Sequence, residues 1–231
     1  MTAPTAPTPV VLITGAAGAL GRAVAQRLGG DSARLVLLDR DAAVLQKFFP
    51  EAAFAEAVDI TDEAAVAATV QRALAALGRL DAVVHVAGGF EMGETVDALS
   101  RTSWERMMAL NAWSFVALAR ACVPAMKRQG SGSLVAVSAA AAGGGQALKG
   151  AYIASKSALQ RLVETLAAEL AGSGIRVNSV APTTLDTPAN RAAMPDADRS
   201  AWVRLDAAAE AIAFLATPAG AAVHGQHLKL G

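Results

Sequence analysis

A tyrosine and a lysine stand four residues apart in this chain, at Tyr152 and Lys156. On a helix this spacing puts both side chains on one face, one turn apart. Tyr152 is the only tyrosine, and a phenol ordinarily has a pKa of about 10. A neighbouring ammonium lowers that pKa, so the pair predicts a group that exchanges protons in general acid–base chemistry. The alternative is a helix that carries a half-buried tyrosine and a solvated lysine.

A glycine-rich turn follows the first apolar segment, residues 10–14, and opens a predicted helix. Such turns let the backbone approach a pyrophosphate, which then binds amide groups at the positive end of the helix. Any tight strand-to-helix turn uses glycine, so the turn by itself is not specific. The strand before it and the helix after it predict a dinucleotide site at Gly15, Ala17, Gly18, Ala19, Leu20 and Gly21.

Asp39 ends the second predicted strand, beyond the glycine turn. A carboxylate at this place accepts hydrogen bonds from the adenosine ribose, and it repels a 2′-phosphate. We therefore expect NAD(H) to be favoured over NADP(H). Arg40 follows directly and softens that preference, so NADP(H) is the second candidate.

Short apolar segments alternate with longer Ala- and Leu-rich segments of helical period. Strands that are apolar throughout indicate burial on both faces, as in a parallel sheet. We predict one α/β domain, a doubly wound parallel sheet (Rossmann fold) of about seven strands with helices on both faces. The predicted strands are 10–14, 34–39, 53–58, 82–87, 133–138, 176–181 and 226–230. The predicted helices are 19–28, 41–48, 62–77, 100–129 (a stretch with room for two helices, and Asn111 in or near a break), 152–171 and 206–216.

Composition narrows the class of protein further. Hydrophobic residues make up 54% of the 231 residues and charged residues 17%, which fits a buried core and excludes disorder. Twenty basic residues balance twenty acidic ones, so we expect neither nucleic acid nor a membrane as a partner. We expect residues 1–9 to be a disordered tail without secretory features, residues 10–231 to form the domain, and the protein to be cytoplasmic. The three histidines lack a metal-ligand pattern, so no metal is expected.

From Val10 onward, these residues resemble the short-chain dehydrogenase/reductase superfamily. In that family a serine at the end of the fifth strand orients the substrate oxygen, and Ser138 matches it. An asparagine of the preceding helix supports a water-linked proton relay, and Asn111 matches it. The resemblance implies catalysis by Asn111, Ser138, Tyr152 and Lys156, with hydride exchanged between a nicotinamide cofactor and a carbonyl or alcohol.

The resemblance also implies further cofactor contacts. Asp59 and Ile60 look like the family's adenine-contacting pair, and Ala87-Gly88 matches the end of its Asn-Asn-Ala-Gly strand. The chain departs from that motif, because His85-Val86 replaces the two asparagines. The cofactor contacts that we expect in addition to the glycine turn are Asp39, Arg40, Asp59, Ile60, Ala87, Gly88, Tyr152, Lys156, Pro182, Leu185 and Thr187.

Two other functions compete with a carbonyl reductase. Residues 184–198 are similar to a segment of dihydropteridine reductases, so reduction of a quinonoid pterin or related ring is one alternative. A non-catalytic dinucleotide sensor is the other, although it predicts loss of the Tyr152/Lys156 pair.

Two structural expectations concern the helix that begins near Tyr152 and the residues after the sixth strand. The helix carries surplus apolar surface, and in the family it pairs with its copy, so we expect a homodimer or homotetramer. Residues 183–202 are expected to close over the cofactor and substrate.

Overall fold

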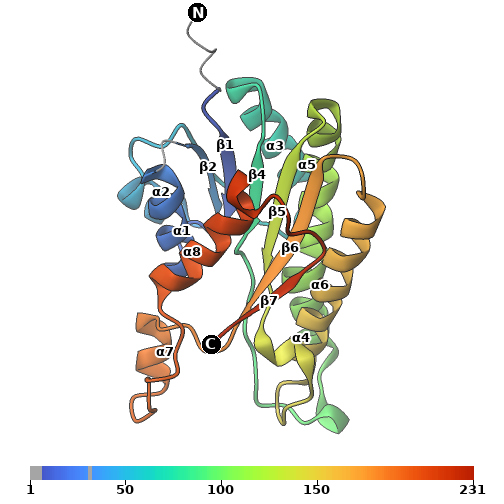
Figure 1. Cartoon of the computed structure of the whole chain (residues 1–231). Helices are drawn as coiled ribbons and strands as arrows, with labels where there is room; N and C mark the ends of the chain where they lie inside the picture. Colours follow the sequence, from blue (N-terminus) through green and yellow to red (C-terminus); the bar gives the residue numbers. More distant parts are fainter. Residues whose placement is uncertain (1–6, 31–32) are drawn as a thin grey trace, which may run out of the picture.

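Seven parallel strands form one sheet in the order β3-β2-β1-β4-β5-β6-β7 (Figure 1). The computed structural model describes residues 7–30 and 33–231, so most of the predicted tail at 1–9 lies outside the described residues. The strand order reverses between β1 and β4, which is where α/β sheets of this type bind ligands at the carboxyl ends of their strands. The strands are β1 Val10–Thr14, β2 Arg34–Asp39, β3 Phe54–Ala57, β4 Ala82–His85, β5 Gly132–Val137, β6 Ile175–Pro182 and β7 His227–Leu230.

Helices cover both faces of this sheet, so the predicted doubly wound fold is confirmed. In β1, Leu12 packs into the core beneath α3, α5 and α6, whereas its neighbour Ile13 packs into the core beneath α1 and α8. Both side chains are fully buried, as a strand covered on two faces requires. The helices are α1 Ala19–Gly30, α2 Ala42–Phe48, α3 Glu63–Leu77, α4 Arg101–Met108, α5 Ser114–Gln129, α6 Gly150–Glu169, α7 Pro188–Ala193 and α8 Leu205–Ala216.

The break expected near Asn111 is a different feature in the structure. A π-helical turn, Ala109–Trp113, joins α4 to α5, so helical structure continues from Arg101 to Gln129. The wider turn inserts an extra residue into the helix, a device found at functional sites. It places Asn111 in the interior without interrupting the helix.

Helical residues Arg101–Gln129 also qualify, by length and composition alone, as a candidate membrane span. The balanced charge of the chain led us to expect no membrane as a partner. Half of the apolar window is buried inside the fold, where Leu118, Cys122 and Met126 pack under the sheet. Core packing therefore accounts for the buried half of this apolar window.

Two further details differ from the predictions. The edge strand β3 alternates half-buried and exposed residues rather than being apolar throughout. Helix α7 lies within the segment 183–202, for which no helix was predicted. Its start is readable in the sequence, because Thr187 caps the helix by accepting from the Asn190 amide and Pro188 occupies its first turn.

Candidate active site

The glycine turn after β1 is held against the end of β4. Gly15 has a φ of +66°, and a Cβ there would lie 2.8 Å from the backbone nitrogen of Ala87. A Cβ on Gly21 would lie 2.0 Å from the Gly15 carbonyl oxygen. Only glycine lets the three backbone segments approach this closely. The turn leads directly into α1. Ala17 and Gly18 lie in the turn, and Ala19 and Leu20 are the first residues of the helix.

Asp39, at the carboxyl end of β2, stabilises this turn through hydrogen bonds. Its Oδ2 accepts a hydrogen bond from the Ala17 amide at 2.9 Å, and its Oδ1 accepts from the Arg40 amide at 2.8 Å. Oδ1 also accepts from the Asp41 amide at 3.4 Å. Because each carboxylate oxygen has two lone pairs, Oδ2 keeps acceptor capacity for a ribose hydroxyl. Asp39 therefore has a structural role in addition to the one expected from the sequence.

Asp59 and Ile60 follow β3, next to Asp39. The Val58 amide donates to the Asp39 carbonyl at 2.8 Å, and Ile60 is buried. Hydrogen bonds from the side chain and backbone of Thr61 lower the pKa of Asp59, and the charge of Arg40 lowers it further. Arg40 thus lies in the field of a carboxylate.

Asn111 connects two segments of the catalytic region. Its Oδ1 accepts from the Gly89 amide at 2.8 Å, while its Nδ2 donates to the Gly89 carbonyl at 3.0 Å and to Ser155 Oγ at 3.0 Å. Ser155 Oγ donates in turn to the Tyr152 carbonyl at 2.8 Å. The side chain expected to anchor a relay water therefore binds protein groups at both of its polar ends. In this arrangement it positions Gly89 and the first turn of α6.

Lys156 lies on the same stretch of α6, and its ammonium is inside the protein. Nζ donates to the Val137 carbonyl at 2.9 Å, and the residue is only 5% exposed. Ser138 is buried beside it and donates from Oγ to the Lys156 carbonyl at 3.3 Å. A Cβ on Gly88 would lie 2.8 Å from Asn111 Oδ1 and 3.0 Å from Lys156 Nζ. The end of β4, the π-helical turn and α6 therefore meet at Gly88.

The electrostatics of the Tyr152/Lys156 pair correct one expectation. We expected the ammonium to lower the pKa of the phenol, but burial raises the pKa of Tyr152 instead. Burial also lowers the pKa of Lys156 to about 8, because a charged ammonium loses hydration there. Desolvation is thus the cause of both pKa shifts in this structure.

His85 is a buried member of this region that the sequence analysis did not assign to it. Ser114 Oγ donates to the Leu110 carbonyl at 2.7 Å, so it accepts from His85 Nε2 at 3.1 Å. His85 Nδ1 is then an acceptor for Thr14 Oγ1 at 2.9 Å, and Thr14 accepts from the Ala87 amide at 3.2 Å. This chain of hydrogen bonds joins the β1 turn to the π-helical turn. The departure from the family's Asn-Asn pair was its only signal in the sequence.

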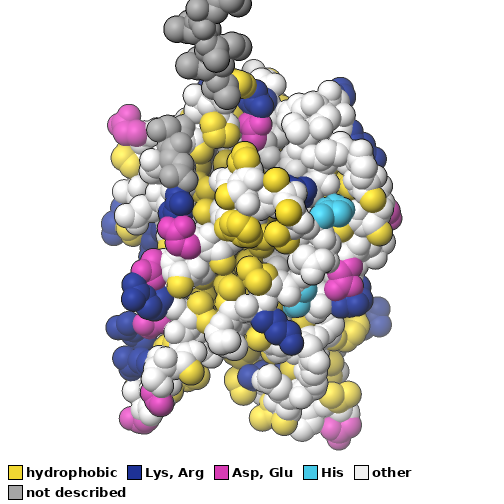
Figure 2. Space-filling model, viewed as in Figure 1, with side chains coloured by type: hydrophobic (Ala, Val, Ile, Leu, Met, Phe, Trp, Pro, Cys, Tyr) yellow, Lys and Arg dark blue, Asp and Glu magenta, His cyan; other side chains and the backbone are white. Residues whose placement is uncertain are grey.

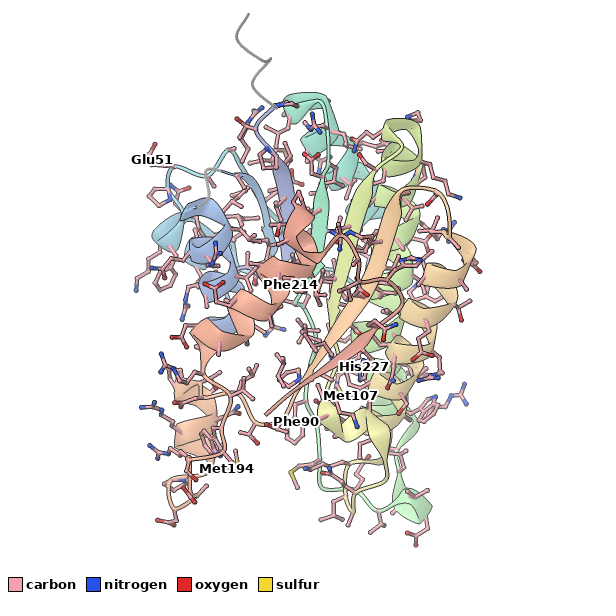
Figure 3. All side chains as sticks on the ribbon, viewed as in Figure 1. Glu51, Phe90, Met107, Met194, Phe214 and His227 are labelled. Atoms are coloured by element: carbon pink, nitrogen blue, oxygen red, sulfur yellow. The ribbon has the colours of Figure 1, made fainter. Side chains whose placement is uncertain are left out.

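The remaining predicted contacts lie beyond β6. Pro182 ends the strand, and Leu185 forms an isolated bridge with Val203. The Thr187 hydroxyl caps α7, so its observed contact is with that helix and not with the four predicted catalytic residues. Figure 2 shows an open notch at the lower edge of the molecule, with the α7 segment on one side. In Figure 3 Met194 lies on this side and Phe90 across from it, under the carboxyl ends of the strands.

The described residues fit a dinucleotide. The glycine turn has no space for side chains at its closest approaches, and α1 presents its amino end there. Among residues 7–30 and 33–231, no group of three or more His, Cys, Asp or Glu side chains is arranged to hold a metal ion. Fold and site together define a dinucleotide-binding α/β oxidoreductase.

Comparison with known proteins identifies the family. Residues 9–198 match the family model described as short chain dehydrogenase, and the chain belongs to the short-chain dehydrogenase/reductase superfamily. It is therefore an NAD(P)-dependent oxidoreductase. The family match and the relatives reported below do not support the narrower resemblance to dihydropteridine reductases.

Three relatives give the degree of similarity. A 2,3-dihydro-2,3-dihydroxybenzoate dehydrogenase of Escherichia coli is 37% identical over 197 residues, which cover 85% of this chain and 74% of the relative. A cis-4-hydroxycyclohexanecarboxylate dehydrogenase of Sinomonas cyclohexanicum is 35% identical over 236 residues, covering 96% and 94%. The structure of a 3-ketoacyl-(acyl-carrier-protein) reductase from Brucella melitensis complexed with NADH has a TM-score of 0.87, with 29% identity and 96% of each chain covered.

The buried His85 generates a prediction about stability in acid. Burial, with a smaller contribution from Lys156, lowers the pKa of His85 from 6.5 to about 3. Between these values the unfolded chain binds the proton and the native protein does not, so stability falls as the pH falls. One such group contributes up to about 1.4 kcal/mol per pH unit.

We expect His85→Asn to remove this contribution, because asparagine keeps a donor and an acceptor but does not titrate. Urea denaturation at pH 7 and pH 4.5 should give a loss of stability about 2 kcal/mol smaller in the variant than in the wild type. Equal losses in both proteins would contradict a buried neutral His85. Each protein serves as its own reference at pH 7, so a general destabilisation by the substitution cancels.

Proposed function

We propose that this enzyme transfers hydride between NAD(H) and an alcohol or carbonyl group on a ring compound, with Tyr152 as the proton donor or acceptor. The observation that carries the proposal is the convergence at Gly88 of Asn111 and the buried Lys156 ammonium. Burying an ammonium is costly unless hydrogen bonds compensate it, and here the Val137 carbonyl accepts one from Lys156 Nζ. A buried cation one helical turn from a phenol, at the carboxyl ends of the strands, suits proton transfer.

In the proposed mechanism each residue has a distinct task. A bound nicotinamide would supply or accept the hydride. Tyr152 Oη gives a proton to the substrate oxygen in reduction and takes it back in oxidation. Ser138 Oγ donates a hydrogen bond to that oxygen and orients it. Lys156 supplies positive charge beneath the site, and Asn111 holds Gly89 and α6 in register with it.

A ring substrate is supported by the names of two relatives. Both are dehydrogenases of hydroxylated compounds whose names end in benzoate or cyclohexanecarboxylate. Phe90 gives this chain a suitable wall, because its ring makes an edge-on contact with the Tyr152 ring at a centroid distance of 4.9 Å. A planar or puckered ring can pack on the exposed face of Phe90 while its oxygen meets the phenol.

The preference for NAD(H) is supported by Asp39 and by the position of Arg40. A 2′-phosphate would meet the carboxylate, and the positive charge of Arg40 already interacts with the Asp59 carboxylate.

The proposed assembly is a two-fold dimer or a tetramer. An apolar groove between α5 and α6, lined by Phe115, Val123, Leu162 and Leu166, supports it.

Turnover of Tyr152→Phe tests the proton role. Because phenylalanine keeps the ring that packs on Phe90 and lacks the hydroxyl, we expect turnover to fall by about 10²-fold or more. NADH binding, measured by fluorescence titration, should stay within about twofold of the wild type and serves as the control for folding. Full turnover in the variant would refute Tyr152 as the proton donor.

Cofactor choice is tested by titrating NADH and NADPH separately. We expect NADH to bind at least about tenfold more tightly, because Asp39 lies where a 2′-phosphate would come. Asp39→Asn keeps the acceptor for the Ala17 amide and removes the negative charge. The variant should therefore have a smaller difference between the NADH and NADPH dissociation constants. Tighter binding of NADPH to the wild type would show that Arg40 outweighs the carboxylate.

A further inference from the structure

The wall of the proposed substrate site carries a charged group. Phe90 is 60% exposed although its ring contacts Tyr152, so one part of this large apolar side chain faces solvent next to the reacting phenol. Lys149 Nζ lies over the same ring, 5.8 Å from its centroid. One aromatic ring therefore contacts the proton-transferring residue and lies within cation–π range of an ammonium (Figure 3 labels Phe90).

The backbone around Lys149 is held in place. Lys149 is the residue before α6, three positions from Tyr152. The Gly93 amide donates to the Leu148 carbonyl at 2.8 Å, and Glu94 forms an isolated bridge with Lys149. The segment that follows Phe90 is thus joined to the backbone of Lys149 next to the start of α6.

The Lys149 ammonium has donors to spare. It donates to Gln146 Oε1 at 2.8 Å, and within the described part of the chain no carboxylate forms an ion pair with it. The nearby acids are engaged elsewhere: Glu91 pairs with Arg106 and accepts from Ser103, and Glu94 Oε2 accepts from the Ser100 amide at 3.2 Å. An ammonium has three donors, so an anion can still bind it directly.

We propose that Phe90 and Lys149 recognise a substrate that is a ring acid: the ring packs on Phe90, its carboxylate binds the Lys149 ammonium, and its hydroxyl or carbonyl group meets Tyr152. The inference rests on the proposed function and adds the substrate class, a hydroxylated or oxidised ring carboxylic acid. Phe90 brings the two groups to one place, because its ring contacts Tyr152 at a centroid distance of 4.9 Å and Lys149 Nζ lies 5.8 Å from its centroid. A charge-assisted hydrogen bond at this half-buried position discriminates an acid from its neutral analogue.

Calorimetry with two matched probes tests this proposal, in the full chain with saturating NAD⁺. Cyclohexanecarboxylate carries the anion, and cyclohexanecarboxamide has the same ring without the charge. Neither has a hydroxyl group, so neither is oxidised and binding is measured without turnover. We expect the wild type to bind the carboxylate at least about tenfold more tightly than the amide.

Three variants make the assignment specific. Lys149→Met should lower affinity for the carboxylate by about tenfold or more and leave that for the amide unchanged, because it removes the charge but keeps an unbranched apolar chain. Lys149→Arg should retain most of the affinity. Lys47→Met is the matched control, since Lys47 Nζ lies 5.4 Å from the Phe48 ring centroid on α2, away from this site.

The outcomes separate this inference from the proposed function. Equal binding of the two probes, no binding of the carboxylate, or an equal effect of Lys47→Met and Lys149→Met would overturn the carboxylate site. NADH oxidation with cyclohexanone, a neutral ring ketone, tests the proposed function separately. Activity with cyclohexanone and no preference for the acid would leave the ring reductase standing and remove only the role of Lys149.

Discussion

The burial of one ammonium group organises the active region. Lys156 is held inside the protein by the Val137 carbonyl, and the Ser138 hydroxyl binds the carbonyl of the same lysine. These contacts tie the carboxyl end of β5 to the second turn of α6, and they bring Tyr152 to the same edge of the sheet. A buried charge is costly without such partners. Burial lowers the pKa of Lys156 to about 8, because the charged form loses hydration. The protonation of the group is therefore sensitive to a charged or polar neighbour.

The surrounding polar groups keep the backbone close to this charge. Asn111 reaches the interior because a π-helical turn displaces it from the regular helix, and there it binds Gly89 and Ser155. On the other side, neutral His85 links the β1 turn to the π-helical turn through Thr14 and Ser114. The cofactor turn and the proton-transfer residues are therefore parts of one hydrogen-bonded unit. A displacement of the cofactor turn should therefore shift the proton-transfer residues, and a displacement of those residues should shift the turn.

Local spacing predicted the parts of the site that lie within one element. The Tyr152/Lys156 pair, the glycine turn and Asp39 follow from helical period, turn chemistry and strand ends, and the alternation of segments predicted the sheet. What spacing could not reveal depends on tertiary burial. The direction of the Tyr152 pKa reflects desolvation, the π-helical turn reflects packing at Asn111, and the role of His85 needs partners from three elements. The α7 cap is readable in the sequence, because Thr187 followed by Pro188 is typical of a helix start.

The central claim is that Lys156 is a buried, weakened base next to Tyr152, and a direct titration measures it. The chain has five lysines, so ¹⁵N labelling of lysine side chains gives five Nζ resonances to follow by NMR as the pH is raised. The account predicts that one resonance titrates near pH 8 and that this resonance is missing in Lys156→Met. The absence of any resonance that titrates near pH 8, or the persistence of that resonance in Lys156→Met, would contradict the account.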